Sequence, residues 1–158
     1  MPERGPSGPL LFLLKKGYSV IMKCPFCEID KEKTRVIKQG KHCYVCFSNP
    51  RLMPAHLLVI SNRHVEKISE LNKEEREELI GFVIEFQEKI ANNIVEGCDI
   101  RQNYRPFMAQ DGFKLDHLHI HLQPREFEDE LYKKCQIFER DIFKPLTREE
   151  IDKIARLL

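Results

Sequence analysis

The chain of 158 residues carries 26 basic and 25 acidic side chains, which leaves a formal net charge of +1 at pH 7. A chain of this length can form one domain with a substantial core. The even charge balance, without a dense basic block, argues against a dedicated nucleic-acid surface. No apolar run is long enough to span a bilayer, so we expect no membrane partner and a cytoplasmic location.

Residues 1–21 differ in character from the rest of the chain. Residues 2–9 are rich in proline and glycine, which predicts disorder. The apolar run of residues 10–14 is followed by two lysines and is too short for a transmembrane helix or a signal-peptide core. We therefore predict that residues 1–21 form a disordered extension. A short strand or partner-binding segment within residues 10–20 is the alternative.

A Cys-x-x-Cys motif follows, with Pro25 between Cys24 and Cys27. A tight turn of this kind can direct two thiolates at one ion, and thiolate is a preferred zinc ligand. The motif lacks the βαβ surroundings of a redox site, and the chain lacks the secretory features that favour a disulfide. A second Cys-x-x-Cys, Cys43 to Cys46, allows a four-cysteine zinc site. Because that segment has a strand pattern, its two thiols are expected on opposite faces as buried side chains.

An apolar strand is predicted at residues 57–60 and a long helix after Asn72. Asn72 suits the N-cap, and four glutamates lie in the first two turns, near the positive end of the helix dipole. Apolar residues then recur at helical spacing and predict a buried stripe: Leu79, Val83, Phe86 and Ile90. Gly97 suits the C-terminal cap of this helix.

Residues 116–125 hold half of the six histidines in the chain. His117, His119 and His121 alternate with three apolar residues, which predicts a half-buried strand with the imidazoles on one face and Leu118, Ile120 and Leu122 facing the core. Neighbours on that face lie roughly 6.5–7 Å apart, a spacing that suits one phosphate-bearing substrate. The alternatives are an amphipathic strand with exposed histidines and a catalytic metal site of the His-x-His kind.

Residues 117–123 resemble the motif of the histidine triad (HIT) superfamily, His-φ-His-φ-His-φ-φ with φ apolar, except that Gln123 is polar. Residues 54–64 resemble the family's Pro-Gly-His-φ-Leu-Val-Ile-Pro-x-x-His segment, with Ala55 in place of glycine and Ser61 in place of proline. The resemblance covers residues 22–125 and implies an α+β fold, an antiparallel sheet with one long helix.

The resemblance also bears on the ends of the chain. Family members commonly begin just before the Cys-x-x-Cys, so Met22 is a candidate true start. After the domain, residues 126–158 have a helical pattern, and Thr147 with Glu150 forms a capping box before a final helix. We expect this extension to pack on the domain. Homodimerisation is a further expectation from the family.

Zinc-bearing members of the superfamily complete their site with two histidines. Carried over to this chain, the resemblance implies a zinc ion held by Cys24, Cys27, His64 and His117. With four protein ligands and no open position, the ion would be structural. The all-cysteine site and a metal-free protein remain the alternatives.

The remaining histidines would carry the chemistry. By resemblance, His119 is the nucleophile that attacks the α-phosphorus of a nucleotide conjugate, such as a dinucleoside polyphosphate or a nucleoside phosphoramidate. His121 would assist the leaving group, and His56 would complete the cluster. The uridylyltransferase branch has glutamine at the position of His121, so histidine here favours hydrolysis.

The substrate-binding residues are less well defined. The phosphate-binding Gly-Gln-Ser or Gly-Gln-Thr of the family and its acidic ribose contact are both missing. Lys114 is a candidate phosphate contact, and Asn49 and Asn103 are candidate contacts for the nucleotide. A zinc-stabilised nucleotide-binding or regulatory module without catalysis is therefore the second interpretation, and a transferase or phosphorylase stays open.

Overall fold

The computed structural model describes residues 24–29, 36–110, 114–136, 139, 142–155 and 157. The predicted N-terminal extension, residues 1–21, and the candidate start at Met22 lie outside the described residues. In the described part of the chain, no helix is both long and apolar enough to cross a membrane.

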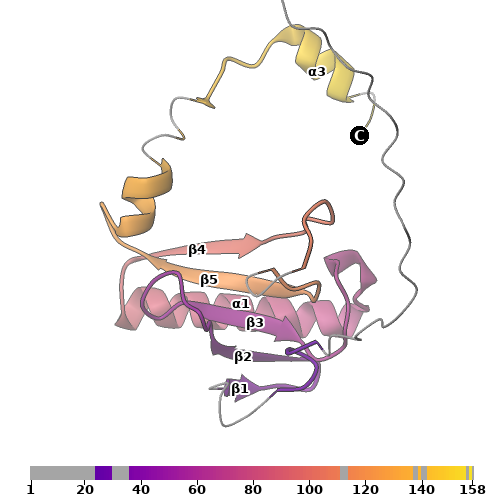
Figure 1. Ribbon diagram of the computed structural model, residues 1–158, viewed down its shortest axis with the longest axis vertical. Coiled ribbons are helices and arrows are strands. Elements are labelled where there is room, and N and C mark those ends of the chain that lie inside the picture. The colour runs from indigo at the N-terminus through magenta and orange to yellow at the C-terminus, as the bar shows by residue number, and fades with distance from the viewer. Residues whose placement is uncertain are drawn as a thin grey trace, which may run out of the picture.

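A five-stranded antiparallel sheet forms the centre of the molecule, with the strand order β1-β2-β3-β5-β4 (Figure 1). Its strands are β1 Val36–Gln39, β2 Cys43–Phe47, β3 Leu57–Ser61, β4 Gly97–Gln102 and β5 His119–Arg125. The histidine-rich strand β5 comes last in the sequence and lies between β3 and β4. The predicted α+β fold is confirmed.

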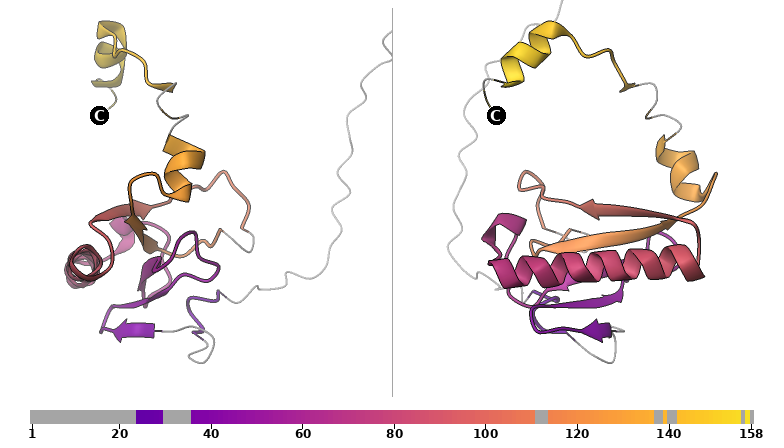
Figure 2. Two further views of the ribbon diagram at one scale, coloured as in Figure 1. Left: turned by 90° about the vertical axis from the view of Figure 1, so that its left-hand side faces the viewer. Right: turned by 180° about the vertical axis from the view of Figure 1, so that it is seen from behind.

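One long helix, α1 (Lys73–Asn93), lies along one face of the sheet, and Figure 2 shows it end-on against the strands. The main core fills the space between them. The predicted helical stripe and the three apolar residues of the triad segment are all buried there: Leu79, Val83, Phe86, Ile90, Leu118, Ile120 and Leu122. Both patterns were therefore read correctly from hydrophobic periodicity.

The start of α1 was also predicted correctly. Asn72 Oδ1 accepts a hydrogen bond of 2.9 Å from Glu75 N, and Glu75 Oε2 accepts one of 2.8 Å from Asn72 N. The prediction for the other end was wrong. The helix ends at Asn93 with Ile94 as its C-cap, and Gly97 is instead the first residue of β4. A Cβ atom at Gly97 would lie 2.6 Å from the carbonyl oxygen of Arg125 on β5. Glycine therefore allows β4 and β5 to approach each other closely at this point.

A smaller apolar cluster covers part of the opposite face of the sheet. It contains Tyr44, Cys46, Leu58 and Ile60, with Phe26, Ile29 and Val36 packed against it. His119 pairs with Ile60 and His121 with Leu58, and directly opposed residues in a sheet share a face. The two histidines therefore lie on the face of the sheet turned away from α1.

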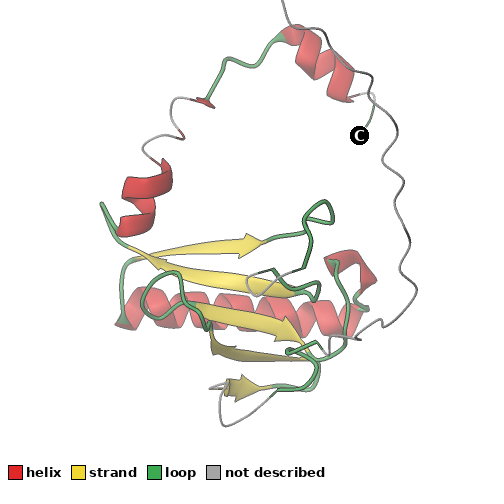
Figure 3. Ribbon diagram, in the orientation of Figure 1, coloured by secondary structure: helices red, strands yellow, loops and turns green. Residues whose placement is uncertain are grey.

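The C-terminal extension contains a short helical turn at Tyr132–Gln136 and the helix α3, Arg148–Ala155. The predicted capping box is present, since Thr147 N donates to Glu150 Oε2 at 2.8 Å and Glu150 N donates to Thr147 Oγ1 at 3.3 Å. Figure 3 shows α3 standing away from the sheet and α1. Phe143 and Leu146, which precede α3, are 76% and 73% exposed. The packing of the extension on the domain stays a prediction.

Candidate active site and metal centre

The four predicted metal ligands come together from three parts of the chain. Cys24 and Cys27 lie in a turn closed by a hydrogen bond of 3.0 Å from Cys27 N to Cys24 O. His64 lies three residues after β3, and His117 lies two residues before β5. One ligand atom from each of the four side chains lies within 4.8 Å of every other, so the group can hold a single ion.

The distances within this cluster fit a tetrahedral metal. Sγ of Cys24 lies 3.3 Å from Nδ1 of His117, and Sγ of Cys27 lies 3.2 Å from Nδ1 of His64. Zinc bonds of about 2.3 Å to sulfur and about 2.0–2.1 Å to nitrogen place tetrahedral ligands roughly 3.5 Å apart. Two thiolates and two imidazoles are a common structural zinc set, and the residues therefore fit that ion.

The second Cys-x-x-Cys does not join this cluster. Cys43 is buried in the main core beneath α1, whereas Cys46 is buried in the small cluster on the opposite face. Burial raises the pKa of the Cys43 thiol to about 12 and that of Cys46 to about 11. The two thiols are buried side chains on opposite faces, as the strand pattern predicted.

Hydrogen bonding assigns the free nitrogen of His119. Its Nδ1 lies 2.6 Å from the carbonyl oxygen of His117, which can only accept, so Nδ1 carries the proton. The lone pair is left on Nε2. A residue of the Cys/His cluster therefore fixes the ring of His119, and His119 has the tautomer that a nucleophile requires.

His121 and His56 form a directly bonded pair. Leu52 N donates to Nδ1 of His56 at 3.2 Å, which places the His56 proton on Nε2. That nitrogen lies 3.0 Å from Nδ1 of His121, and the two rings stack with centroids 5.1 Å apart. The proton of His121 is then on its own Nε2. The pair thus presents an N–H donor beside His119, whose ring centroid is 4.8 Å from that of His121.

Burial keeps these imidazoles neutral. It lowers the pKa of His56 to about 4 and that of His121 to about 3. The positive charge that a neighbouring histidine would carry if protonated lowers both pKa values further, and Arg101 also lowers that of His121. Burial also lowers the pKa of His119, against the hydrogen bond to His117, which raises it. A neutral His119 keeps its lone pair available at pH 7.

Phe26, between the two cysteines, joins the metal cluster to the triad. Its ring meets that of His117 edge-on at 5.7 Å and that of His119 edge-on at 5.3 Å between centroids. Tyr44 Oη donates to the carbonyl oxygen of Phe26 at 3.1 Å and so fixes the turn to the sheet. Sequence reasoning missed this residue, although its place inside the cysteine turn put it close to the ligands.

The predicted substrate-binding residues lie in different surroundings. Asn103 is one residue beyond the pairing of Gln102 with Ile120, which places it level with His119, and its Oδ1 accepts from Arg101 Nε at 3.0 Å. Asn49 is exposed in the loop between β2 and β3. Lys114 donates to Met108 O at 2.7 Å and pairs with Asp116, so its ammonium group is bound within its own loop.

Arg101 gained importance from the structure. From sequence alone, a single surface arginine is weak evidence for a phosphate contact. In the sheet it pairs directly with His121, so its guanidinium lies on the face that carries the triad. The signal was the strand register, which the sequence alone does not reveal.

Comparisons with known proteins agree with this geometry. Residues 30–128 match the model of the HIT domain. The chain is 27% identical over 104 residues to the AP-4-A phosphorylase of Mycobacterium tuberculosis. This alignment covers 64% of this chain and 53% of the phosphorylase. The chain thus spans about half the length of the curated relatives that it matches.

Solved structures show the same fold. A HIT family protein from Bacillus anthracis superposes with a TM-score of 0.63 at 22% identity, covering 86% of this chain and 94% of that one. A HIT family hydrolase from Legionella pneumophila has a TM-score of 0.52 at 22% identity, over 68% and 96% of the two chains. With the domain match over residues 30–128, these findings establish that the chain belongs to the HIT domain family.

Proposed function

We propose that this protein is a nucleotide hydrolase or nucleotidyl transferase that acts on the α-phosphate of a nucleotide conjugate. The substrate would be a dinucleoside polyphosphate or a nucleoside phosphoramidate. One observation carries the proposal: the Nδ1 proton of His119 is bound to the carbonyl oxygen of His117, which leaves Nε2 as a free base on the triad face. The named HIT hydrolases and phosphorylase among the similar proteins support this reaction class.

The reaction would proceed in two steps. Nε2 of His119 attacks the α-phosphorus, a P–N bond forms, and the bond from phosphorus to the leaving group breaks. The leaving oxygen or nitrogen takes the Nε2 proton of His121, while the guanidinium of Arg101 stabilises the phosphoryl oxygens. Water or another acceptor then attacks phosphorus and gives its proton to Nε2 of His121, and the P–N bond breaks. The nucleoside monophosphate, or its conjugate with the acceptor, is released and His119 regains its lone pair.

A zinc ion bound by Cys24, Cys27, His64 and His117 would have a structural part in this scheme. When bound, it would hold the cysteine turn against the start of β5 and take no part in the phosphoryl chemistry, since all four ligands come from the protein. His117 would then present its carbonyl oxygen to His119 from a fixed position.

The test compares wild-type protein with His119→Ala on adenosine and guanosine conjugates, with product release and acid-quenched intact mass as readouts. We expect turnover and a nucleoside-monophosphate adduct in wild type alone, with a loss of about 10⁴-fold or more in the variant. His42→Ala is a control, because His42 lies in the β1–β2 turn outside the histidine cluster. Turnover that survives His119→Ala would contradict the covalent mechanism.

A second function deserves the same experiment. The engaged ammonium of Lys114 and the missing ribose acid favour a nucleotide-binding or regulatory module in which the histidines only contact phosphate. That interpretation predicts nucleotide binding without turnover or adduct. Addition of inorganic phosphate separates the remaining case, because a phosphorylase would form a nucleoside diphosphate where a hydrolase forms a monophosphate.

A further inference from the structure

His117 depends on Ser61 for the side of its ring that faces away from the cysteines. Its Nδ1 faces Cys24 and Cys27, while its Nε2 lies 2.8 Å from Ser61 O and 3.2 Å from Ser61 Oγ. The carbonyl oxygen can only accept, so Nε2 carries the proton and the lone pair on Nδ1 points at the thiol groups. Ser61, at the end of β3, is only 2% exposed.

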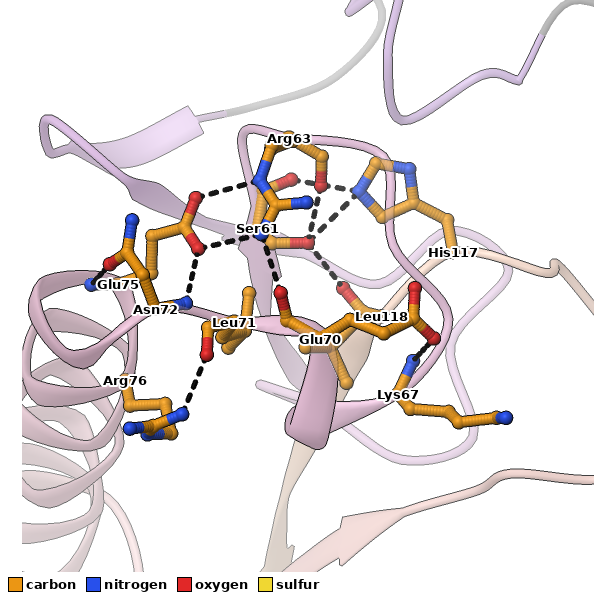
Figure 4. Close-up of polar contacts among 10 residues, drawn as sticks. All are labelled: Ser61, Arg63, Lys67, Glu70, Leu71, Asn72, Glu75, Arg76, His117 and Leu118. Atoms are coloured by element: carbon orange, nitrogen blue, oxygen red, sulfur yellow. Dashed lines mark hydrogen bonds and ion pairs between the residues drawn. The ribbon is translucent and has the colours of Figure 1, made fainter.

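The hydroxyl of Ser61 extends this contact to Arg63. Ser61 Oγ donates to the carbonyl oxygen of Arg63 at 2.9 Å, so its oxygen is free to accept from Nε2 of His117 (Figure 4). The single Nε2 proton of His117 is therefore shared between the carbonyl and hydroxyl oxygens of Ser61. The hydroxyl proton of Ser61 is directed mainly at Arg63 O, with Leu118 O at 3.4 Å as a longer acceptor. The residue that follows Arg63 is the other predicted histidine ligand, His64.

Arg63 in turn is fixed to the beginning of α1. Its Nε and Nη2 donate to the two carboxylate oxygens of Glu75 at 2.9 and 2.8 Å, and Nη2 also donates to Glu70 O at 2.7 Å. Glu75 is 7% exposed and is held by the capping box with Asn72. A forked, buried carboxylate contact of this kind fixes both orientation and distance.

We propose that Ser61, Arg63 and Glu75 are positioning residues for the metal centre, connecting the N-terminus of α1 to His117 and His64. Ser61 fixes the tautomer and ring orientation of His117, and the Arg63–Glu75 pair fixes the turn that carries His64. The inference rests on the proposed metal site and goes beyond its four ligands. It also gives the hydroxyl of Ser61 a function at a position where the triad family has proline, because proline has no side-chain hydrogen-bond donor.

The test measures metal affinity in the full chain rather than activity. Apoprotein is titrated with Co²⁺, whose thiolate charge-transfer and ligand-field bands report a tetrahedral sulfur–nitrogen site, and zinc affinity is obtained by chelator competition. Ser61→Ala keeps the carbonyl oxygen that His117 contacts and removes only the hydroxyl. We expect it to weaken zinc binding by about 10-fold, the lower end of the range found for partners of metal-bound histidines. Glu75→Gln and Arg63→Gln each break the side-chain pair that holds the His64 turn, so each should weaken zinc binding by several-fold. The loss should be smaller than for Ser61→Ala, because the carbonyl oxygen of residue 63 still accepts from Ser61 Oγ.

Matched controls separate this role from general destabilisation. Glu85→Gln removes another α1 carboxylate, one paired with Lys38 and Lys89 away from the cluster. Val59→Ala opens a cavity in the core from the same strand as Ser61. Both should bind zinc within about 2-fold of wild type, once measured under conditions where the variant is folded.

The outcomes are distinguishable. Wild-type affinity in folded Ser61→Ala and Arg63→Gln would overturn the positioning role and leave the metal site intact. Failure of the wild-type protein itself to bind Co²⁺ or Zn²⁺ would overturn the metal site and the positioning role together. Neither result depends on turnover, so the nucleotidyl-transfer proposal is tested separately by His119→Ala. The side chain of Arg63 is about half exposed, so Arg63→Gln should fold. This variant therefore still tests the positioning role if Ser61→Ala does not fold.

Discussion

Ala55 is a single residue with an unfavourable backbone conformation. Its φ is 56°, in the left-handed region that costs a residue with a Cβ about 1–2 kcal/mol and costs glycine little. The family has glycine at this position, directly before His56. We therefore expect Ala55→Gly to raise the free energy of unfolding by about 1 kcal/mol, measured by urea denaturation.

The opposite sign is expected for the same change in a helix. Ala91 lies in α1, where glycine costs about 1 kcal/mol relative to alanine. Ala91→Gly should therefore lower the free energy of unfolding. A loss of stability in both variants would show that the left-handed backbone at Ala55 carries no strain.

The buried histidines make stability depend on pH. His56 and His121 have folded pKa values of about 4 and 3, below the ordinary value of 6.5 that they regain on unfolding. As the pH falls below 6.5, the unfolded chain binds protons that the folded chain does not. The free energy of unfolding should fall by up to about 1.4 kcal/mol per pH unit for each histidine and level off near the folded pKa values.

This dependence can be assigned by comparing wild type with His121→Gln between pH 7.5 and 4.5. Glutamine does not titrate, so the slope of unfolding free energy against pH should be shallower by about one proton. Metal release at low pH affects both proteins and cancels in the difference. Equal slopes would mean that His121 has an ordinary pKa in the folded protein.

Among single residues of the candidate site, those that belong to a sequence motif could be predicted. Residues that reach the site only because the chain folds could not. The alternation correctly predicted the strand that carries His119 and His121, whereas His117 lies two residues before the start of β5. Phe26 and Ser61 carry no motif signal of their own, and their contacts depend on how the cysteine turn and β3 meet β5. The position of Arg101 opposite His121 follows only from the pairing of β4 with β5.

At the scale of helices and strands, replacing glycine with alanine should change the free energy of unfolding in opposite directions at two positions. Gly97 begins β4, and an added Cβ would come within 2.6 Å of Arg125 O on β5. Gly81 lies in α1, where an added Cβ would meet nothing within 4 Å. We expect Gly97→Ala to lower the free energy of unfolding by about 1–3 kcal/mol and Gly81→Ala to raise it by about 0.5–1 kcal/mol.

Thermal unfolding followed by circular dichroism would measure both changes. The substitution is chemically the same at both sites, so the opposite signs separate the steric contact at Gly97 from the gain in helix propensity at Gly81. A tolerated alanine at Gly97 would mean that β4 and β5 can separate slightly without loss, and the close approach would then be unimportant for stability.

Elements were predictable where one periodicity dominates. The stripe of α1 and the alternation in β5 follow from burial of one face, and the Asn72 cap follows from hydrogen-bonding chemistry. The prediction for Gly97 was wrong because glycine is common both after the end of a helix and where two strands approach closely. The position of α3 could not be inferred, since its capping box specifies a helix but not a partner surface.

For the whole molecule, the metal cluster predicts a stability that depends on zinc. The ligands join residues 24–27 to His64 and His117, and a ligand that binds only the folded state adds stability as its free concentration exceeds its dissociation constant. We expect a zinc chelator to lower the thermal midpoint by several degrees. Cys24→Ser should abolish that response, whereas Cys98→Ser should retain it because Cys98 lies outside the cluster.

The homodimer expected from the family stays a prediction at this scale. Several apolar side chains are exposed on α1 and in the C-terminal extension: Ile80, Ile84, Phe143 and Leu146. Sedimentation equilibrium of the full chain at micromolar concentration would measure its oligomeric state. A monomer would contradict the expectation.

The order of the strands also dictates when the site can form during synthesis. β5 is the last strand to emerge from the ribosome, yet it fills the gap between β3 and β4. Until residues 117–125 are available, the apolar strand Leu57–Ser61 has one open edge, the candidate metal cluster lacks His117, and the proposed nucleophile His119 is missing. A nascent chain shorter than this would lack the proposed activity and would be vulnerable to edge-to-edge association. Completion of the sheet, metal capture and the appearance of the reactive imidazole would become a single late event of folding.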